Sequence, residues 1–214
     1  MLLKSIFTNS SGILVSRVLG FIRDLLTASV LGANIYSDIF FVAFKLPNLF
    51  RSIFADGAFT QAFIPSYAKS KHKIRFSSVI FLQLFGFLII LSLLVMAFSH
   101  FVAKAIAIGF DEKTVDLAAP LFAINFYYLP IIFAVTFMAA LLQYKRHFAT
   151  SAYSTALLNI AMIIALLISQ NMEKYTITFY LSYGVICGGI LQISVHLYAL
   201  RKNNLCKIFH FKKH

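Results

Sequence analysis

Seven charged side chains lie within the first long apolar stretch of this sequence. The stretch runs from residue 16 to residue 65 and reads SRVLGFIRDLLTASVLGANIYSDIFFVAFKLPNLFRSIFADGAFTQAFIP. Its charged residues are Arg17, Arg23, Asp24, Asp38, Lys45, Arg51 and Asp56. A charge at the centre of a bilayer costs about 2.5 to 3.5 kcal/mol even on the most permissive scale. Because the later apolar segments carry almost no charge, we interpret these residues as the lining of a polar cavity for a charged substrate.

The three arginines indicate the sign of that substrate. A guanidinium group stays charged at any relevant pH and grips phosphate oxygens in a fixed fork. A proton relay would favour carboxylates and histidines, and a voltage sensor would repeat arginine every third residue. Arg17, Arg23 and Arg51 therefore predict an anionic substrate, with phosphate as the best match. The structural alternative is that Arg23 and Asp24 snorkel near a helix end and that Asp56 belongs to an ordinary loop.

The spacing of the other charges favours pairing around one aqueous space. An α-helix turns about 100° per residue, so residues seven or eleven positions apart lie close to one face. Arg17 and Asp24 are seven apart, as are Asp38 and Lys45, and Lys45 and Asp56 are eleven apart. We expect Asp24, Asp38, Lys45 and Asp56 to act as charge-pairing residues around this space. Buried ion pairs with a purely structural role are the alternative.

Pro47 lies in the middle of the second apolar segment. Proline lacks an N–H and clashes with the carbonyl group four residues earlier, so it predicts a helix kink there. A kink of this kind widens a cavity and frees backbone polar groups to face it. Asn48, beside the kink, is expected to offer hydrogen bonds to the substrate.

The composition is that of an all-α integral membrane protein. The chain has 214 residues, of which 60% are hydrophobic and 12% charged, and its mean hydropathy is +0.85. A soluble domain has about 25% charged residues. Spanning helices need about 20 apolar residues, and the apolar runs are about twice as long as barrel strands and do not alternate. The sequence predicts a single bundle over 1–214 with six helices, at about 6–30, 35–64, 79–98, 117–142, 150–169 and 175–200.

The basic residues of the loops predict the orientation of this bundle. Lysine and arginine are concentrated at Lys4, in the loops 69–75 and 145–146, and in the tail 201–214. With six helices these regions all lie on one side, and the opposite loops are neutral or acidic. By the positive-inside rule, both termini and the basic tail are cytoplasmic. The net charge of +12 therefore mostly reflects the orientation of the loops in the membrane and does not indicate nucleic-acid binding. Anionic membrane lipids are a secondary partner for these basic residues.

Other chemistry is poorly supported by the sequence. The six histidines show no metal-ligand spacing and are interpreted as loop and interface residues, and no nucleotide-binding or hydrolase motif is present. We expect no catalytic residue, no metal and no cofactor. Gly188 and Gly189 predict a tight helix-packing point. Tyr127, Tyr128 and Pro130 interrupt the fourth segment, either at packing positions or in the cavity lining.

Three stretches resemble a known family. SRVLGFIRD at 16–24, SDIFFVAFKLPNLFRSIFADGAFTQAFIP at 37–65 and LNIAMI at 158–163 are similar to the MurJ (MviN) family of the multidrug/oligosaccharidyl-lipid/polysaccharide exporter superfamily. The resemblance is dense over the first two helices and looser but collinear over the rest. It implies a transporter, not an enzyme, of the bacterial inner membrane. The expected substrate is lipid II, the undecaprenyl-pyrophosphate-linked peptidoglycan precursor, which is flipped by alternating access for cell wall synthesis.

The resemblance also implies roles for particular residues. Family residues important for substrate binding or function correspond to Arg17, Arg23, Asp38, Asn48 and Arg51. The arginines would hold the pyrophosphate and nearby polar groups of the sugar-peptide, and Asp38 would act as a gate or a conformational pairing residue.

The resemblance covers only the first of the family's two helix bundles. We therefore expect this chain to be the N-terminal lobe of the exporter fold, working with a separate second half or with a second copy of itself. The alternatives are a flippase for another polyprenyl-pyrophosphate-linked glycan, and a non-transporting half that needs a separate second bundle.

Overall fold

The computed structural model describes residues 2–55 and 58–205. These ranges contain nine α-helices and no strand, as the sequence predicts for an all-α protein. The helices are α1 (Leu2–Val30), α2 (Ile35–Ala55), α3 (Ala58–Lys69), α4 (Lys73–Ala97), α5 (Ser99–Ile106), α6 (Glu112–Phe126), α7 (Tyr128–Tyr144), α8 (Ala149–Ser169) and α9 (Lys174–Lys202).

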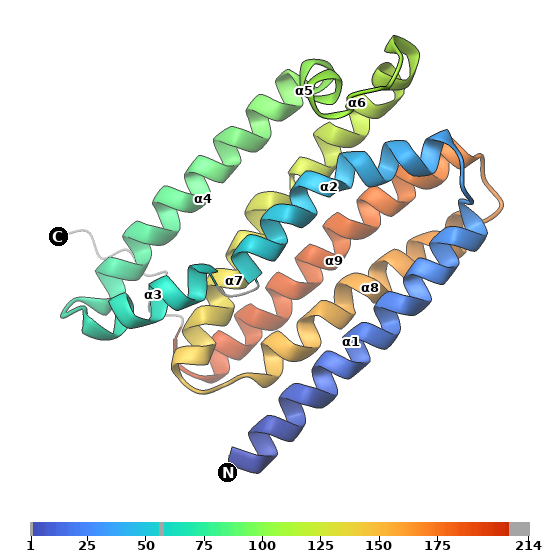
Figure 1. The fold of residues 1–214 in the computed structure, drawn as a ribbon. Coiled ribbons are helices and arrows are strands. Elements are labelled where there is room, and N and C mark those ends of the chain that lie inside the picture. Colours follow the sequence, from blue (N-terminus) through green and yellow to red (C-terminus); the bar gives the residue numbers. More distant parts are fainter. Residues whose placement is uncertain (1, 56–57, 206–214) are drawn as a thin grey trace.

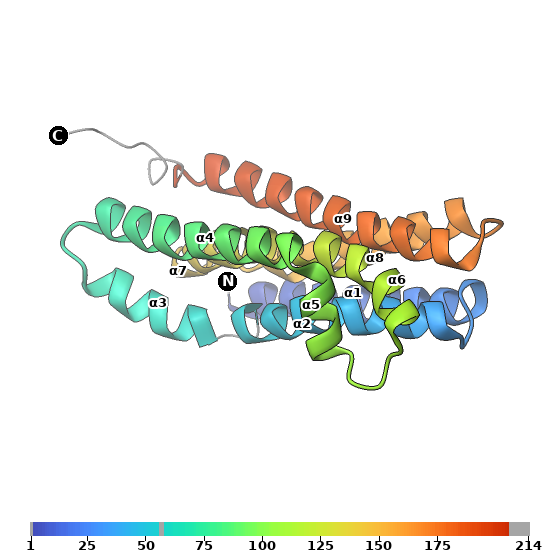
Figure 2. The same ribbon diagram turned by 90° about the horizontal axis from the view of Figure 1, so that it is seen from above.

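The long helices run along a common direction and form two layers. Figure 2 shows α1, α2 and α3 on one side and α4 and α9 on the other, with α7 and α8 close behind them. Helix α8 packs against both α1 and α9, whereas α2 packs against α6 and α7. Helices α1 and α2 therefore rest on different parts of the second layer. In Figure 1 they meet at the turn that joins them and diverge toward their other ends.

Four helical segments of the described chain are long and apolar enough to cross a membrane. They are Lys73–Ala97, Glu112–Tyr144, Ala149–Ser169 and Lys174–Lys202. Two of the six expected helices are each observed as a pair, because the range 35–64 contains α2 and most of α3, and the range 117–142 contains parts of α6 and α7. Helix α2 continues through Pro47, which is buried.

The break between α6 and α7 follows from Pro130. A proline has no N–H, so the carbonyl group of Phe126, four residues earlier, loses its usual helical donor. The Ser92 hydroxyl of α4 lies 2.9 Å from the Phe126 carbonyl oxygen and replaces that donor. Tyr127 instead donates its N–H to Ile124, at 3.2 Å, which is the tighter spacing of a helix end. A buried serine thus stabilises an interrupted spanning segment.

A tight turn joins α1 and α2. Gly32 has φ +78°, which is a left-handed conformation that glycine adopts without strain. The Asn34 side-chain oxygen accepts hydrogen bonds from the N–H groups of Tyr36, at 2.9 Å, and Ser37, at 3.2 Å. These bonds satisfy free donors at the start of α2, where asparagine is a favoured capping residue.

Glycines bring α9 into close contact with its neighbours, and the predicted packing point is confirmed. A Cβ atom on Gly188 would lie 2.9 Å from the Cα atom of Leu158 in α8. One on Gly189 would lie 2.5 Å from a side-chain carbon of Ile131 in α7. Neither site has room for a side chain, so these residues set the distances between α9, α8 and α7.

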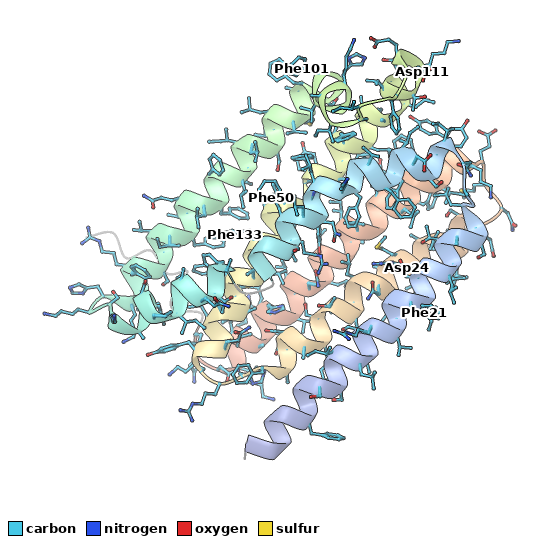
Figure 3. The ribbon with its side chains drawn as sticks, in the orientation of Figure 1. Phe21, Asp24, Phe50, Phe101, Asp111 and Phe133 are labelled. Carbon is cyan, nitrogen blue, oxygen red and sulfur yellow. The ribbon has the colours of Figure 1, made fainter. Side chains whose placement is uncertain are left out.

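Helix α7 is the central element of the core, whereas α4 is mostly exposed. Nearly every residue from Tyr128 to Leu142 is buried. Rings from α3, α4 and α7 pack together beside it, namely Phe59, Phe63, Phe76, Phe81, Phe133 and Phe137. Figure 3 labels Phe50 and Phe133, which lie where α2 passes over α7. This aromatic cluster fixes α3 and α4 against the central helix.

Candidate anion-binding site

Arg23 is held by partners on two helices. Its guanidinium group donates to the Asn159 side-chain oxygen of α8 at 2.9 Å and to the Asp24 carboxylate at 2.7 Å. Asn159 is buried and donates in turn to the backbone oxygen of Ser16, at 3.0 Å. One buried amide therefore joins α1 to α8 and orients Arg23. The charge of Arg23 is largely compensated by Asp24, which is labelled in Figure 3.

Arg17 lies on the same helix but is exposed. Its side chain makes no hydrogen bond or ion pair with the residues that the structure describes. Its neighbour Ser16 donates its hydroxyl to the backbone oxygen of Ala152, at 3.3 Å. The two arginines of α1 thus differ, because Arg23 is fixed against α8 and Arg17 is not.

Arg51 lies near the end of α2 and has a different environment. Its Nε donates to the side-chain oxygen of Asn48, one turn earlier, at 2.9 Å. The sequence had paired these two residues as substrate ligands, and they are in direct contact here. This bond uses one of the five guanidinium donors, and no carboxylate among the described residues pairs with Arg51. Its positive charge is therefore left without a counter-charge in the described chain.

Arg51 lines a polar cavity of about 180 Å³. The cavity is enclosed by α2, α3, α7, α8 and α9, and Arg51 is the only ionised side chain among the described residues that line it. The other lining residues are Thr60, Tyr128, Ile132, Val135, Thr136, Ala139, Gln143, Ser151, Ser154, Thr155, Leu158, Gln192 and His196. A lone cation beside neutral hydrogen-bonding groups is suited to an anion attached to an uncharged polar group.

The remaining predicted charges lie away from this cavity. Asp38, in the first turn of α2, and Lys45 are exposed, and neither side chain makes an ion pair with the described residues. Asp56 lies outside the described residues. Arg23 lies at the α1–α8 contact with Asp24 beside it, Arg17 is exposed on α1, and none of the three lines the cavity. The structure therefore separates the candidate residues into an α1–α8 group and an Arg51 group.

Several cavity residues were not singled out from the sequence. Thr136, Ser154 and Gln192 are neutral polar residues inside apolar helices. This is the only feature of the sequence that could have identified them as cavity residues. The interpretation of all histidines as loop or interface residues is wrong for His196, which is fully buried in α9. The reason is that α9 packs on its neighbours through its glycines, so the face that carries His196 is turned into the bundle. Tyr128 lines the polar cavity, whereas Tyr127 and Pro130 line a separate apolar one of about 530 Å³.

Comparison with known proteins identifies the family. A family described as "Lipid II flippase MurJ" matches residues 27–214. This chain belongs to the MurJ lipid II flippase family. A MurJ relative from Helicobacter pylori (strain ATCC 700392 / 26695), named "Probable lipid II flippase MurJ", is 52% identical over 181 residues, which cover 85% of this chain and 39% of the relative.

More distant MurJ relatives match in the same way. The protein of Rhizobium tropici is 36% identical over 91% of this chain and 38% of its own length. That of Buchnera aphidicola from Acyrthosiphon pisum is 36% identical over 98% of this chain and 42% of its own length. The chain thus spans about two-fifths of the length of these curated relatives, corresponding to the N-terminal part of the MurJ family.

A solved structure has the same fold. The structure titled "Lipid II flippase MurJ, inward closed conformation" superimposes with a TM-score of 0.80 over 94% of this chain and 45% of that one, at 24% identity. The nine described helices therefore adopt the arrangement of part of a MurJ protein. Together with the four apolar spans, the MurJ family membership makes this chain a multi-pass protein of the bacterial inner membrane.

Proposed function

We propose that this chain forms the N-terminal lobe of a flippase that moves lipid II, the undecaprenyl-pyrophosphate-linked peptidoglycan precursor, across the inner membrane. The observation that carries the proposal is Arg51, a cation without a carboxylate partner in the described chain, lining a polar cavity inside an apolar bundle. Membership of the MurJ family supplies the class of substrate. Flipping makes and breaks no covalent bond, so the activity is transport.

The charged residues of α1 and α2 have distinct parts in this proposal. Arg51 and Asn48 hold the pyrophosphate at the cavity, and Arg17 and Arg23 extend the positive surface along α1. Asp24 competes with the anion for Arg23. Asp38 and Lys45 act in gating, where they pair only in another conformation, and Asp56 belongs to the same set. Pro47 remains a proposed point of bending in α2.

Six crossings with both ends in the cytoplasm fit the arrangement of the helices. Figure 1 places the start of α1, the loops 70–72 and 145–148 and the end of α9 at one end of the bundle. The turn 31–34 and the loop 170–173 lie at the opposite end. The first set contains the basic loops, so the positive-inside rule assigns it to the cytoplasm.

Cysteine labelling tests this orientation. In a chain with Cys187→Ala and Cys206→Ala, single cysteines are introduced as Ala33→Cys, Asn171→Cys, Lys71→Cys or Lys145→Cys, all at exposed positions. A membrane-impermeant maleimide should label the first two in spheroplasts and the last two only after lysis. Labelling of Lys71→Cys in intact spheroplasts would contradict the proposed topology.

Transport by alternating access needs a second bundle to close the cavity from the other side. The relatives matched here are more than twice as long as the region that this chain matches. We therefore propose that a second bundle, either the other half of the transporter or a second copy of the chain, completes the transporter. Another polyprenyl-pyrophosphate-linked glycan remains the alternative substrate, because Arg51 would bind its pyrophosphate equally well.

Split complementation tests the function. The chain is expressed in bacteria depleted of their own lipid II flippase, alone and together with the remaining part of the Helicobacter pylori relative. We expect rescue in the co-expressing cells, and its loss with Arg51→Ala. The matched control is Arg75→Ala, which removes an exposed arginine at the start of α4 and should still permit rescue.

Each outcome has a distinct meaning. Rescue by the chain alone would indicate that two copies suffice. Rescue that survives Arg51→Ala would exclude the proposed anion site. Absence of rescue in cells where both parts are present in the membrane at normal levels would exclude the chain as a working lobe of a lipid II flippase.

A further inference from the structure

The polar cavity beside Arg51 contains an unusual concentration of unsatisfied hydrogen-bonding atoms. In the described residues, six buried side-chain nitrogen or oxygen atoms have no hydrogen-bond partner. Five of them belong to residues that line this cavity, namely Tyr128, Thr136, Ser151, Gln192 and His196. Four of these residues are at most 4% exposed. Buried polar groups in folded proteins are nearly always hydrogen-bonded, so such a cluster indicates a ligand.

Two of the five atoms are fixed as acceptors. His196 Nδ1 lies 2.8 Å from the backbone oxygen of Gln192, which can only accept, so Nδ1 carries the proton. In the neutral ring, Nε2 is then an acceptor. The Gln192 amide nitrogen donates to the backbone oxygen of Ser154 at 3.0 Å, which leaves Oε1 as an acceptor. The two residues are one helical turn apart, so both acceptors belong to the same face of α9.

The other three atoms are the hydroxyl oxygens of Tyr128, Thr136 and Ser151, each of which can donate and accept. The site thus offers two acceptors and three groups of mixed character. Sugar hydroxyls are also donors and acceptors at once and match this set. A peptide segment would match it less well, because each amide supplies its donor and its acceptor at separate, fixed positions.

The charge and size of the cavity limit its ligand further. Arg51 disfavours a cation, and no carboxylate lines the cavity within the described residues. An anion alone would leave the two acceptors unsatisfied. The volume of about 180 Å³ is below the roughly 300–1,000 Å³ of pockets that enclose whole drug-sized ligands, so only part of a larger molecule fits.

We propose that this cavity is a sugar subsite, which binds the first sugar ring attached to the pyrophosphate that Arg51 holds. The proposal rests on the proposed function and extends it, because it assigns a second, uncharged recognition element to α7, α8 and α9. Arg51 then binds any polyprenyl pyrophosphate, and the five neutral residues select one that carries a sugar. Discrimination between glycosylated and bare lipid arises from hydrogen bonds and not from charge.

The test measures binding of two ligands to the full 214-residue chain in nanodiscs by native mass spectrometry. The ligands are undecaprenyl pyrophosphate and the same lipid carrying the peptide-free disaccharide. The variants are Tyr128→Phe and Thr136→Val, which remove only an unpartnered hydroxyl and preserve the shape of the side chain. Tyr127→Phe is the matched control, because it removes a hydroxyl at the next residue, which lines the apolar cavity and contacts the Met96 sulfur.

We expect the unmodified chain to bind the glycosylated lipid more tightly than the bare one. Each cavity variant should lose about three- to tenfold in affinity for the glycosylated lipid and keep its affinity for the bare lipid. Tyr127→Phe should change neither. The thermal midpoint of the cavity variants should not fall, because a buried group without a partner contributes nothing to stability.

The outcomes separate this proposal from the function on which it rests. Equal binding of both lipids by the unmodified chain, or equal losses for both lipids in the variants, would overturn the sugar subsite and leave the anion site intact. Loss of bare-lipid binding in Arg51→Ala would support the anion site independently. Failure of the chain to bind either lipid would overturn both. Preference for a lipid with a peptide over the peptide-free disaccharide would assign the cavity to the peptide and also contradict the subsite.

Discussion

Arg23 and Arg51 are both arginines in the charged pair of helices, yet the structure gives them opposite environments. Arg23 contacts a carboxylate beside it and a buried amide on α8, and these partners compensate its charge and fix its position. Within the described chain, the Arg51 guanidinium group hydrogen-bonds only to Asn48 of its own helix, and the cavity that it lines contains no carboxylate. The difference shows that a charge inside an apolar segment is not by itself a ligand-binding group. What matters is whether the fold has already supplied its partner.

Helices α1 and α2 differ in how they are attached to the rest of the bundle. Helix α1 is attached to α8 through Asn159 and through a close contact between Gly12 and Ala152, where a Cβ atom on Gly12 would lie 2.7 Å from the Ala152 side chain. Helix α2 rests on α6 and α7 and carries Arg51, which pairs with no carboxylate among the described residues. We therefore expect substitutions at the Arg23 region to change stability and substitutions at the Arg51 region to change binding.

We expect the largest loss of stability from a substitution against α8, because this helix contacts Arg23 and also lines the Arg51 cavity. Leu158 lines the Arg51 cavity, Asn159 holds Arg23, and Gly188 of α9 packs against this part of α8. Gly188→Ala places a Cβ atom 2.9 Å from the Leu158 Cα atom, and such overpacking costs about 1–3 kcal/mol. A thermal unfolding series in detergent should show a lower midpoint and weaker binding of polyprenyl pyrophosphate.

The control for this substitution is Gly86→Ala in α4. A Cβ atom on Gly86 would meet nothing within 4 Å, and alanine is the better helix former. Its midpoint should be unchanged or slightly higher. Equal destabilisation by the two substitutions would mean that α8 and α9 are not in close contact at this point.

Asn159→Leu removes the α8 partner of Arg23 and leaves the Arg51 side chain unchanged. The variant loses the bonds to Arg23 and to the Ser16 backbone, and leaving such groups unpaired costs about 1–3 kcal/mol. The same unfolding measurement should show a lower midpoint, while binding of undecaprenyl pyrophosphate through Arg51 is retained. Asn171→Leu, at an exposed loop position, serves as the control. A variant that unfolds normally but no longer binds the lipid would place Arg23 in the ligand site.

Asp24→Asn should have the smallest effect. The Asp24 side chain is 66% exposed, and exposed ion pairs contribute about 0–1 kcal/mol, so stability should hardly change. The substitution removes the counter-charge of Arg23, and affinity for inorganic pyrophosphate should rise by at most about fivefold in a low-salt titration. Asp116→Asn, at an exposed position of α6 where the carboxylate contacts His100 of α5, should leave this affinity as it is. An unchanged titration in both variants would indicate that Arg23 does not face the ligand.

The charged residues and the general fold could be predicted from the sequence. Charges are rare in membrane helices and therefore stand out, and the long apolar runs have the length that spanning helices need. Arginines in an apolar run are conspicuous, and Gly188 and Gly189 in a spanning helix are typical of close packing. The turn at Gly32 follows from local chemistry alone. These features depend on a few neighbouring residues and not on which helix lies next to which.

The neutral residues of the cavity were not accessible in this way. Thr136, Gln192 and His196 are compatible with any face of a membrane helix, and only the packing of α7, α8 and α9 turns them toward one space. The break at Tyr127 also depends on a distant partner, because Ser92 of another helix satisfies the carbonyl group that Pro130 leaves free. Likewise, the sequence does not distinguish Arg23 from Arg51, because only the packing of α8 against α1 places Asn159 beside Arg23.

The turn between α1 and α2 has a consequence for how the chain enters the membrane. Neither helix is among the four segments of the described chain that are apolar enough to cross by themselves. They are joined by the few residues around Gly32, with Asn34 capping the start of α2. A connection this short gives the translocon no opportunity to handle the two helices separately. We therefore expect them to be integrated as one helical hairpin during synthesis, after which α8 emerges from the ribosome and secures α1 in place.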